Sequence, residues 1–281
     1  MKKTFCAILV MVLMLTSAFA MADEINVISR EDGSGTRGAF IELFGIEQKN
    51  EAGEKVDYTT EACDITNSTS VMMTSVSGND CAIGYISLGS LNDTVKALAI
   101  DGTDASVENI QAGSYNVARP FNIATLAETS DVAQDFIAFI MSADGQVVIE
   151  ENGYIAVAED ADAFEGAKVS GKIVIAGSSS VTPVMEKLAE AYMDISPNVE
   201  IELQQSDSSS GMTSTRDGVC DIGMASRVLK NSEIEAGLIP MTIAKDGIAV
   251  IVSLDNPVNG LTSEQVRDIY MGEITDWSEV E

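Results

Sequence analysis

The sequence predicts an α/β protein. Short runs rich in valine and isoleucine alternate with segments of helical periodicity, which is typical of strands that lead into helices. The chain has 281 residues, 46% hydrophobic and 21% charged, so it is long enough to bury one or two cores. The expected strands are 25–29, 82–86, 172–176, 199–204 and 248–252, and the expected helices are 38–44, 131–141, 183–193 and 263–270.

Two of these helices carry clear start signals. Thr182 precedes Pro183, which places a capping residue before a first-turn proline. Thr262 and Gln265 have the spacing of a capping box, and apolar residues then follow on one helical face. The pattern therefore predicts helix starts near 183 and 263.

Residues 1–20 are typical of a secretory signal peptide. Two lysines precede an apolar run over 5–15, and Ala-Phe-Ala at 18–20 fits a cleavage site. This run and every later apolar stretch are too short to span a bilayer, so we expect a soluble, extracytoplasmic mature protein. A disulfide is allowed there: Cys63 pairs with Cys81 and leaves Cys220 over, or all three cysteines are unpaired, buried side chains.

The charge and the missing histidine exclude several functions. The formal net charge is −28, so we expect no binding to nucleic acid or to anionic membrane surfaces. The chain has no histidine, which excludes Ser-His-Asp and Cys-His catalytic sites and imidazole metal sites. The cysteines lack metal-ligand spacing, so we expect neither a metal nor a cofactor.

Three expected strands each lead through a small polar loop into a helix. The loops are 30–36, 177–180 and 206–211, and all are rich in serine, threonine or glycine. Backbone N–H groups at a helix start, hydroxyl donors and close glycine backbone suit an oxyanion, and Arg30 adds a two-pronged cationic donor. One such loop is typical of an ordinary helix cap. Three of them favour a shared anionic ligand.

The segment 158–171 differs from its surroundings. It is acidic, rich in small residues and contains two glycines. This composition predicts a linker between two segments of comparable length.

Several segments resemble the phosphate-binding proteins of ABC-type phosphate importers. The matching stretches are IAGSSSVTPVMEKLAEAY, CDIGMASRVLK, LTSEQVRDIYMGEITDW, VISREDGSGTRGAF, AIGYISLGSLN and GSYNVARPF. The resemblance implies a two-lobed, periplasmic-binding-protein-like (type II) fold with the ligand in a cleft between the lobes. In the family the GSSSVTP segment comes first, whereas here SREDGSGTR does. The segment order is therefore interpreted as circularly permuted, with 158–171 joining the family's usual ends.

The resemblance also implies the division into lobes. Lobe A would span 121–250, and lobe B would combine 25–120 with 251–281. The chain would cross between them near 119–120 and near 253–257, and the lobes would close by hinge motion. We expect a monomer; the alternative is a rearranged chain that folds as a partner-swapped dimer.

The family's anion-binding positions transfer to seven residues of this sequence. Asp32 would hold Arg30 in its orientation without itself contacting the ligand. Residues 209 and 210 are near alternatives in the second serine loop, and 68–69 resemble another cleft-facing loop. The expected phosphate ligands are Arg30, Ser34, Gly35, Thr36, Ser179, Ser180 and Ser208, with Ser209 as an alternative.

One position departs from the family pattern. Some members place an aspartate after Gly-Ala-Ser to accept the proton of a protonated phosphate. Here Ser226 has that place and Arg227 lies beside it, which leaves the choice between phosphate and sulfate open. Arg227 is either a second anion contact or an ordinary surface arginine.

The function implied by the resemblance is capture of inorganic phosphate outside the cytosol and delivery to an ABC permease in the membrane. Such a solute-binding protein is not an enzyme and needs no cofactor. The alternatives are a protein that binds sulfate, molybdate or another tetrahedral oxyanion, a serine-based phosphatase, and a phosphate sensor that acts through a partner.

Overall fold

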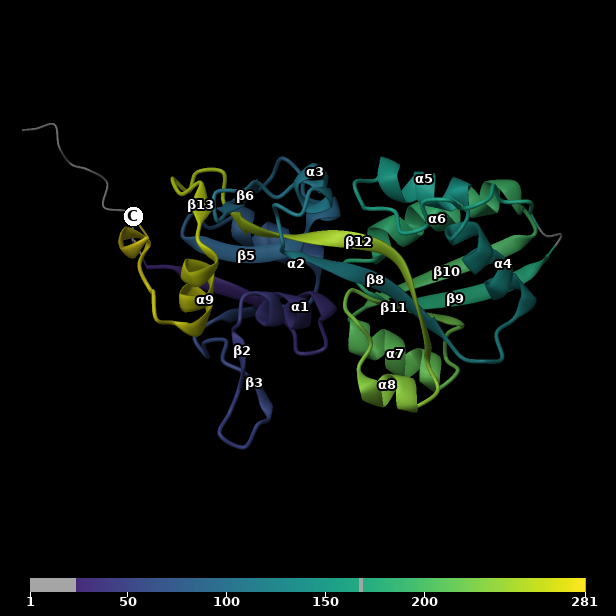
Figure 1. Cartoon of the computed structure of the whole chain (residues 1–281), viewed down its shortest axis with the longest axis horizontal. Helices are drawn as coiled ribbons and strands as arrows, with labels where there is room; N and C mark the ends of the chain where they lie inside the picture. The colour runs from purple at the N-terminus through teal and green to yellow at the C-terminus, as the bar shows by residue number, and fades with distance from the viewer. Residues whose placement is uncertain (1–23, 167–168, 281) are drawn as a thin grey trace, which may run out of the picture.

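The computed structural model describes residues 24–166 and 169–280, so the predicted signal peptide at 1–20 lies outside the described residues. Two α/β lobes lie side by side, joined by two long strands, β8 (Ala118–Thr125) and β12 (Ile239–Val252) (Figure 1). We keep the name lobe A for the teal and green half and the name lobe B for the purple and blue half, which also contains the yellow α9 and β13. The predicted α/β class is confirmed.

One sheet runs through both lobes. Its order is β10 (Val199–Ser206), β9 (Gly171–Ser178), β11 (Ile222–Ala225), β8, β12, β5 (Ala82–Ser87), β1 (Asn26–Arg30) and β4 (Asp64–Thr66), with β6 (Lys96–Ala97) also on β12. The strands β10, β9 and β11 are parallel to one another, as are β5, β1 and β4. Their carboxyl ends therefore gather polar loops at one edge of each lobe. The remaining strands form the pairs β2 (Glu47–Lys49) with β3 (Lys55–Asp57), and β7 (Ala99–Ile100) with β13 (Gly260–Leu261).

The helices cover the faces of this sheet. Lobe B contains α1 (Gly35–Leu43), α2 (Thr69–Ser77), α3 (Val107–Gln111), α9 (Ser263–Met271) and the 3₁₀ turns η1 (Leu88–Ser90) and η2 (Trp277–Glu279). Lobe A contains α4 (Asp131–Ile140), α5 (Ala143–Glu151), α6 (Thr182–Ile195), α7 (Ser208–Arg216) and α8 (Asn231–Glu235). Within the described ranges, no single helix is long and apolar enough to cross a membrane; only α4 and α5 together meet that criterion, with a 61° bend between them.

The expected elements are present, with differences at their ends. The capping box of Thr262 and Gln265 is confirmed at the start of α9. In contrast, α6 begins one residue earlier than expected, at Thr182, whose hydroxyl donates to the Ser178 carbonyl instead of capping the helix. The strand expected at 248–252 is only the second part of β12. The sequence does not predict the first part, because its residues mix apolar and polar side chains and include Pro240.

Each lobe has its own hydrophobic core, and β12 contributes to both. Ile243 and Ala244 pack in the lobe A core, whereas Ile248 and Val250 pack in the lobe B core. The strand also changes its pairing partner from β8 to β5 between Gly247 and Ile248. The crossing therefore lies earlier than the predicted boundary at 250 and the predicted crossover near 253–257, because the strand continues unbroken into lobe B.

A buried ion pair marks the crossing. The Arg119 Nη2 lies 3.1 Å from Asp246 Oδ2, and both side chains are excluded from solvent. Asp246 also accepts hydrogen bonds from the Ser87 hydroxyl at 2.9 Å and from the Gly89 N–H at 3.4 Å. Since a buried charge without its partner is strongly destabilising, this pair fixes where the hinge strands meet lobe B.

The two ends of the described chain lie together at the edge of lobe B. Glu24 forms an antiparallel bridge with Asp276, and the Ile25 N–H donates to the Thr275 carbonyl at 2.8 Å.

The predicted linker is irregular from 158 to 166, where Phe164 packs against the lobe A core. The Cys63–Cys81 disulfide is not formed, because Cys63 is a free thiol, as is buried Cys220.

We expect Gly177→Ala to lower the free energy of unfolding by about 2–3 kcal/mol in urea denaturation. Gly177 lies one residue before the end of β9 with a φ of +132°, and a Cβ there would meet the Met224 carbonyl and lie 3.0 Å from the Met224 nitrogen. The matched control is Gly78→Ala, with a φ of −92° and its nearest neighbour at 3.4 Å. That control should change stability by less than about 0.5 kcal/mol. Equal losses in the two variants would contradict the expectation.

Candidate functional site

Four helices of eight or more residues begin at the interface between the lobes. They are α1 and α2 of lobe B and α6 and α7 of lobe A, and each follows the carboxyl end of a sheet strand. Their first residues, Gly35, Thr69, Thr182 and Ser208, are all buried. Helix N-termini carry partial positive charge and N–H groups without intrahelical partners, so their convergence favours a negatively charged ligand.

Hydroxyl groups from these helix starts meet an arginine across the interface. The Thr36 and Ser180 hydroxyls are 2.7 Å apart, Thr69 lies 3.2 Å from Ser180, and the Arg30 Nη2 donates to Ser179 at 3.1 Å. All five side chains are at most 4% exposed. We call Arg30, Thr36, Thr69, Ser179 and Ser180 the anion cluster.

A second serine group lies directly behind Gly35. The Ser178 hydroxyl donates to the Ser226 hydroxyl at 3.0 Å, and the Ser226 N–H donates to the Ser208 hydroxyl at 3.2 Å. A Cβ on Gly35 would lie 2.7 Å from the Ser226 hydroxyl and would also collide with Ser208. The absence of a side chain at Gly35 therefore lets the α1 backbone approach lobe A.

Arg30 has partners for only part of its guanidinium. Its Nε and Nη2 donate to the two carboxylate oxygens of Glu31, each at 2.8 Å. Its Nη1 is buried and has no hydrogen-bond partner among residues 24–166 and 169–280. A buried donor of this kind normally requires an acceptor, so the guanidinium retains the capacity to bind an anion.

Tyr85 supports the backbone of Arg30. Its hydroxyl accepts a hydrogen bond from the Arg30 N–H at 3.1 Å and lies 2.9 Å from the Ser29 hydroxyl. Burial raises the pKa of Tyr85 to about 12, so the phenol stays neutral at physiological pH. Its ring stacks on Phe40 with 3.9 Å between centroids, which fixes the end of β1 against α1.

Arg37 stabilises the loop that carries Arg30. Its Nη1 donates to the Arg30 carbonyl at 2.7 Å, and its Nη2 lies 2.8 Å from Asp57 Oδ2. Burial raises the pKa of Asp57, but hydrogen bonds from Thr59 and the charge of Arg37 outweigh it and leave that pKa below its usual value. Asp57 is therefore ionised at neutral pH.

The predicted role of Asp32 is wrong. Its carboxylate is 99% exposed and lies 3.0 Å from Arg37 Nη1, whereas Glu31 forms the paired hydrogen bonds to Arg30. Asp32 occupies the turn after β1 and points to solvent, while the longer side chain of Glu31 reaches back along the guanidinium.

Three further predicted residues lie at the rim of the cluster. Ser34 caps α1 by accepting from the Arg37 N–H at 3.3 Å. The Ser209 N–H donates to the Gly33 carbonyl at 3.2 Å, and its hydroxyl accepts from Arg227. Arg227 is paired with Glu233 at 2.8 Å, so its charge is already compensated away from the anion cluster.

Thr69 belongs to the anion cluster but is absent from the seven expected phosphate ligands. Residues 67–69 fit a glycosylation sequon or a polar helix start, and the structure confirms the helix start, with Ser68 capping α2. In the structure β4 leads into α2 as a fourth strand-to-helix corner, and the polar run 66–69 is the signal for it in the sequence. Within the described part of the chain, no group of three or more Cys, Asp or Glu side chains is placed to hold a metal ion.

Comparison with known proteins identifies the family. A model described as "PBP superfamily domain" matches residues 17–144 and 162–281. The phosphate-binding protein PstS 2 of Streptococcus agalactiae is 57% identical over 257 residues, which cover 91% of this chain and 87% of that protein. The chain belongs to the PstS family of phosphate-binding proteins.

Other members differ in how much of this chain they match. The crystal structure of a phosphate-binding protein of a Streptococcus pneumoniae phosphate ABC transporter is 43% identical, with a TM-score of 0.72, over 92% of this chain and all of that one. This match confirms the two-lobed periplasmic-binding-protein architecture. The PstS of Pseudomonas aeruginosa is 35% identical over 109 residues, which cover only 36% of this chain and 34% of that protein.

We expect Asp57→Asn to lower the free energy of unfolding by about 1 kcal/mol at pH 7. A carboxyl with a lowered folded-state pKa stabilises above its unfolded pKa, and this stabilisation is lost as pH falls through the folded value. The difference from the unmodified protein should therefore shrink between about pH 4 and pH 3 in urea denaturation. Exposed Asp93 provides the control Asp93→Asn, which should show no such trend. A difference that is constant with pH would contradict the assignment.

Proposed function

We propose that the protein binds inorganic phosphate between its lobes and delivers it to an ABC permease. The observation that carries this proposal is the anion cluster, in which hydroxyls of both lobes surround a buried guanidinium whose Nη1 has no partner among the described residues. The proposal agrees with the names of the streptococcal relatives. We expect the anion to interact with the Arg30 guanidinium, the hydroxyls of the cluster and the N–H groups that begin α1, α2, α6 and α7.

The number of donors fits the energy that binding requires. A multivalent anion leaves water only if its oxygens are paired, and each charge-assisted hydrogen bond contributes about 1.5–3 kcal/mol. Micromolar affinity needs about 8 kcal/mol net. Several donors must therefore act together, and this site collects them from four helix starts and one arginine.

The acidity of the chain does not oppose the proposal. The net charge of −28 is spread over the whole chain, and exposed charges are screened beyond about 8 Å at physiological salt. At the site itself, both carboxylate oxygens of Glu31 accept hydrogen bonds from the Arg30 guanidinium. The local donors act at contact distance, where screening is small.

The contacts across the interface describe a closed arrangement of the lobes. Arg30 to Ser179, Thr36 to Ser180 and the Ser209 N–H to Gly33 each join one lobe to the other. Ligand exchange requires these contacts to separate, and β8 and β12 are the strands about which the lobes rotate. We propose that the protein acts as an extracytoplasmic, non-enzymatic monomer.

We also propose that the segment order is permuted relative to part of the family. In support, the streptococcal relative matches nearly the whole chain, whereas the Pseudomonas relative matches about a third of it. Glu24 and Asp276 form an antiparallel bridge, so these two positions are close enough to be joined directly in the other segment order. New ends are tolerated where they leave the surface of a lobe intact.

Arg30→Ala should weaken phosphate binding at least a hundredfold in isothermal titration calorimetry, because it removes the charge and several donors at once. Circular dichroism should show a folded protein. Arg216→Ala is the control, since Arg216 is exposed on α7 and paired with Asp217. It should change the affinity less than twofold.

Unchanged phosphate binding in Arg30→Ala would overturn the proposed site. If that variant does not fold, Thr36→Val tests the same site while retaining the shape of the side chain, and it should weaken binding about tenfold. Titration with sulfate separates the alternatives: tighter binding of sulfate than of phosphate would refute the proposed ligand.

Glu31→Gln and Asp32→Asn form a matched pair of adjacent changes. Glu31→Gln replaces one charge-assisted hydrogen bond to Arg30, so phosphate binding should weaken about tenfold. Asp32→Asn should leave the affinity unchanged, because Asp32 is exposed and contacts only Arg37. The reverse order of effects would restore the predicted role of Asp32.

A further inference from the structure

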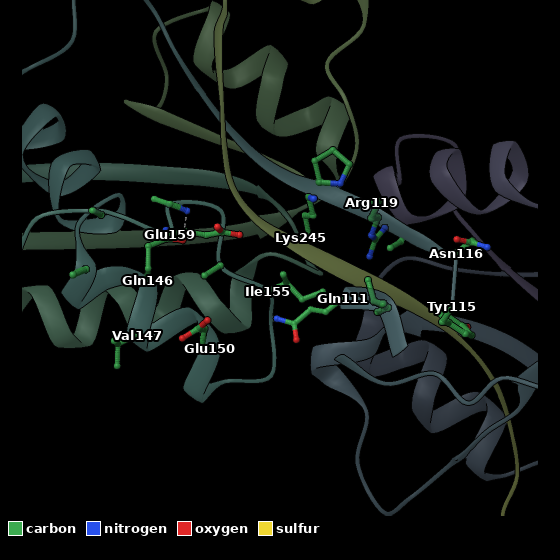
Figure 2. Close-up of a pocket in the computed structure, with 17 residues that line it drawn as sticks. Gln111, Tyr115, Asn116, Arg119, Gln146, Val147, Glu150, Ile155, Glu159 and Lys245 are labelled. Carbon is green, nitrogen blue, oxygen red and sulfur yellow. Dashed lines mark hydrogen bonds between the residues drawn. The ribbon is translucent and has the colours of Figure 1, made fainter. Parts of the chain in front are cut away.

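A large groove lies against the hinge strands, outside the anion cluster. Its volume is about 880 Å³, within the range of about 300–1,000 Å³ that is usual for small-molecule sites. One wall comes from lobe B around α3, the other from lobe A around α5, and the floor is formed by β8 and β12 (Figure 2). We call it the back groove. The polar side chains that line it include Gln111, Asn116, Arg119, Glu150, Glu159 and Lys245.

The back groove and the anion cluster lie on different sides of the hinge. The cluster residues Ser179 and Ser180 follow the carboxyl end of β9, whereas the groove borders β12 where Lys245 bridges Ile155. Figure 1 shows α3 and α5 on one side of β8 and β12, and α1 and α7 on the other. A rotation about these strands that narrows one gap therefore widens the other.

The charges in the back groove are separated by sign. Lys245 lies on β12, and Figure 2 shows Glu150 and Glu159 across the groove from it, on the lobe A wall. Arg119 on β8 is already paired with buried Asp246. Lys245, Glu150 and Glu159 form no ion pair with any described residue. The buried Arg119 Nη1 likewise has no hydrogen-bond partner there.

Apolar side chains also line the groove. Ile110 extends from α3, Val147 from α5, and Ile155 lies beside the floor. A simple anion would meet both glutamates and a simple cation would meet Lys245. A zwitterion with an aliphatic body matches both ends and the middle.

We propose that the back groove is a second binding site, for an amino acid or short peptide with an aliphatic side chain, and that its occupation favours the closed lobes. The coupling to phosphate rests on the proposed function. A ligand that binds a groove present in the closed arrangement shifts the lobes toward closure and thereby raises the affinity of the anion cluster. The coupling is reciprocal, so phosphate raises the affinity of the groove by the same factor.

A tryptophan that fills the groove tests the coupling directly. Ala156 lines the groove and is half-buried, so Ala156→Trp should hold the back of the hinge apart. We expect phosphate to bind at least threefold tighter, and the radius of gyration without phosphate to move toward that of the phosphate-bound protein. The control is Ala127→Trp, at an exposed lobe A position that does not line the groove; it should change neither quantity.

Unchanged or weaker phosphate binding in Ala156→Trp, with an unchanged radius of gyration, would overturn the coupling. Scattering without phosphate reports lobe closure by itself. A protein that binds no phosphate but still becomes more compact with Ala156→Trp would refute the proposed function and keep the hinge coupling.

Calorimetric titration with glycyl-leucine tests the ligand class on the unmodified protein. We expect saturable binding that tightens in the presence of phosphate. Lys245→Gln should weaken it at least fivefold without changing the affinity for phosphate alone. Absence of binding, or binding insensitive to Lys245→Gln, would overturn the assignment of the groove.

Discussion

A buried guanidinium organises the space between the lobes. Arg30 is 1% exposed, and an ion so far from water requires partners on every side. Glu31 supplies one side, Ser179 of the opposite lobe supplies another, and Nη1 is left over for a ligand. The geometry of the lobe interface thus depends on satisfying one charge, and the helix starts and hydroxyls take their positions around it.

Much of the fold followed from patterns in the sequence. Alternating apolar runs and capping signals located the strands β1, β5, β9 and β10 and the helices α4 and α9, because those elements contribute regular faces to the two cores. The strands β4, β8 and β11 were not located. The extent of β12 did not follow, because its first part owes its strand conformation to pairing with β8, a contact distant in sequence. Local propensity contains no information about such a partner.

Only part of the site could be predicted from the sequence. Glycine and serine loops before helices have a local signature, so Arg30, Thr36 and Ser180 were within reach of sequence reasoning, although only the structure brings them together. The exchange of roles between Glu31 and Asp32 depends on how a single turn directs two adjacent side chains. Arg37 donates to the Arg30 carbonyl and pairs with Asp32, and the sequence does not reveal these contacts.

The unbroken course of β12 has a consequence for how the molecule unfolds. The same strand completes the sheet of lobe A with Ile243 and that of lobe B with Val250. If one lobe unfolds, β12 loses its pairing there and the sheet of the other lobe is weakened as well. The two lobes therefore unfold together instead of as separate domains. The element that permits rotation is thereby also the one that makes the protein a single cooperative unit.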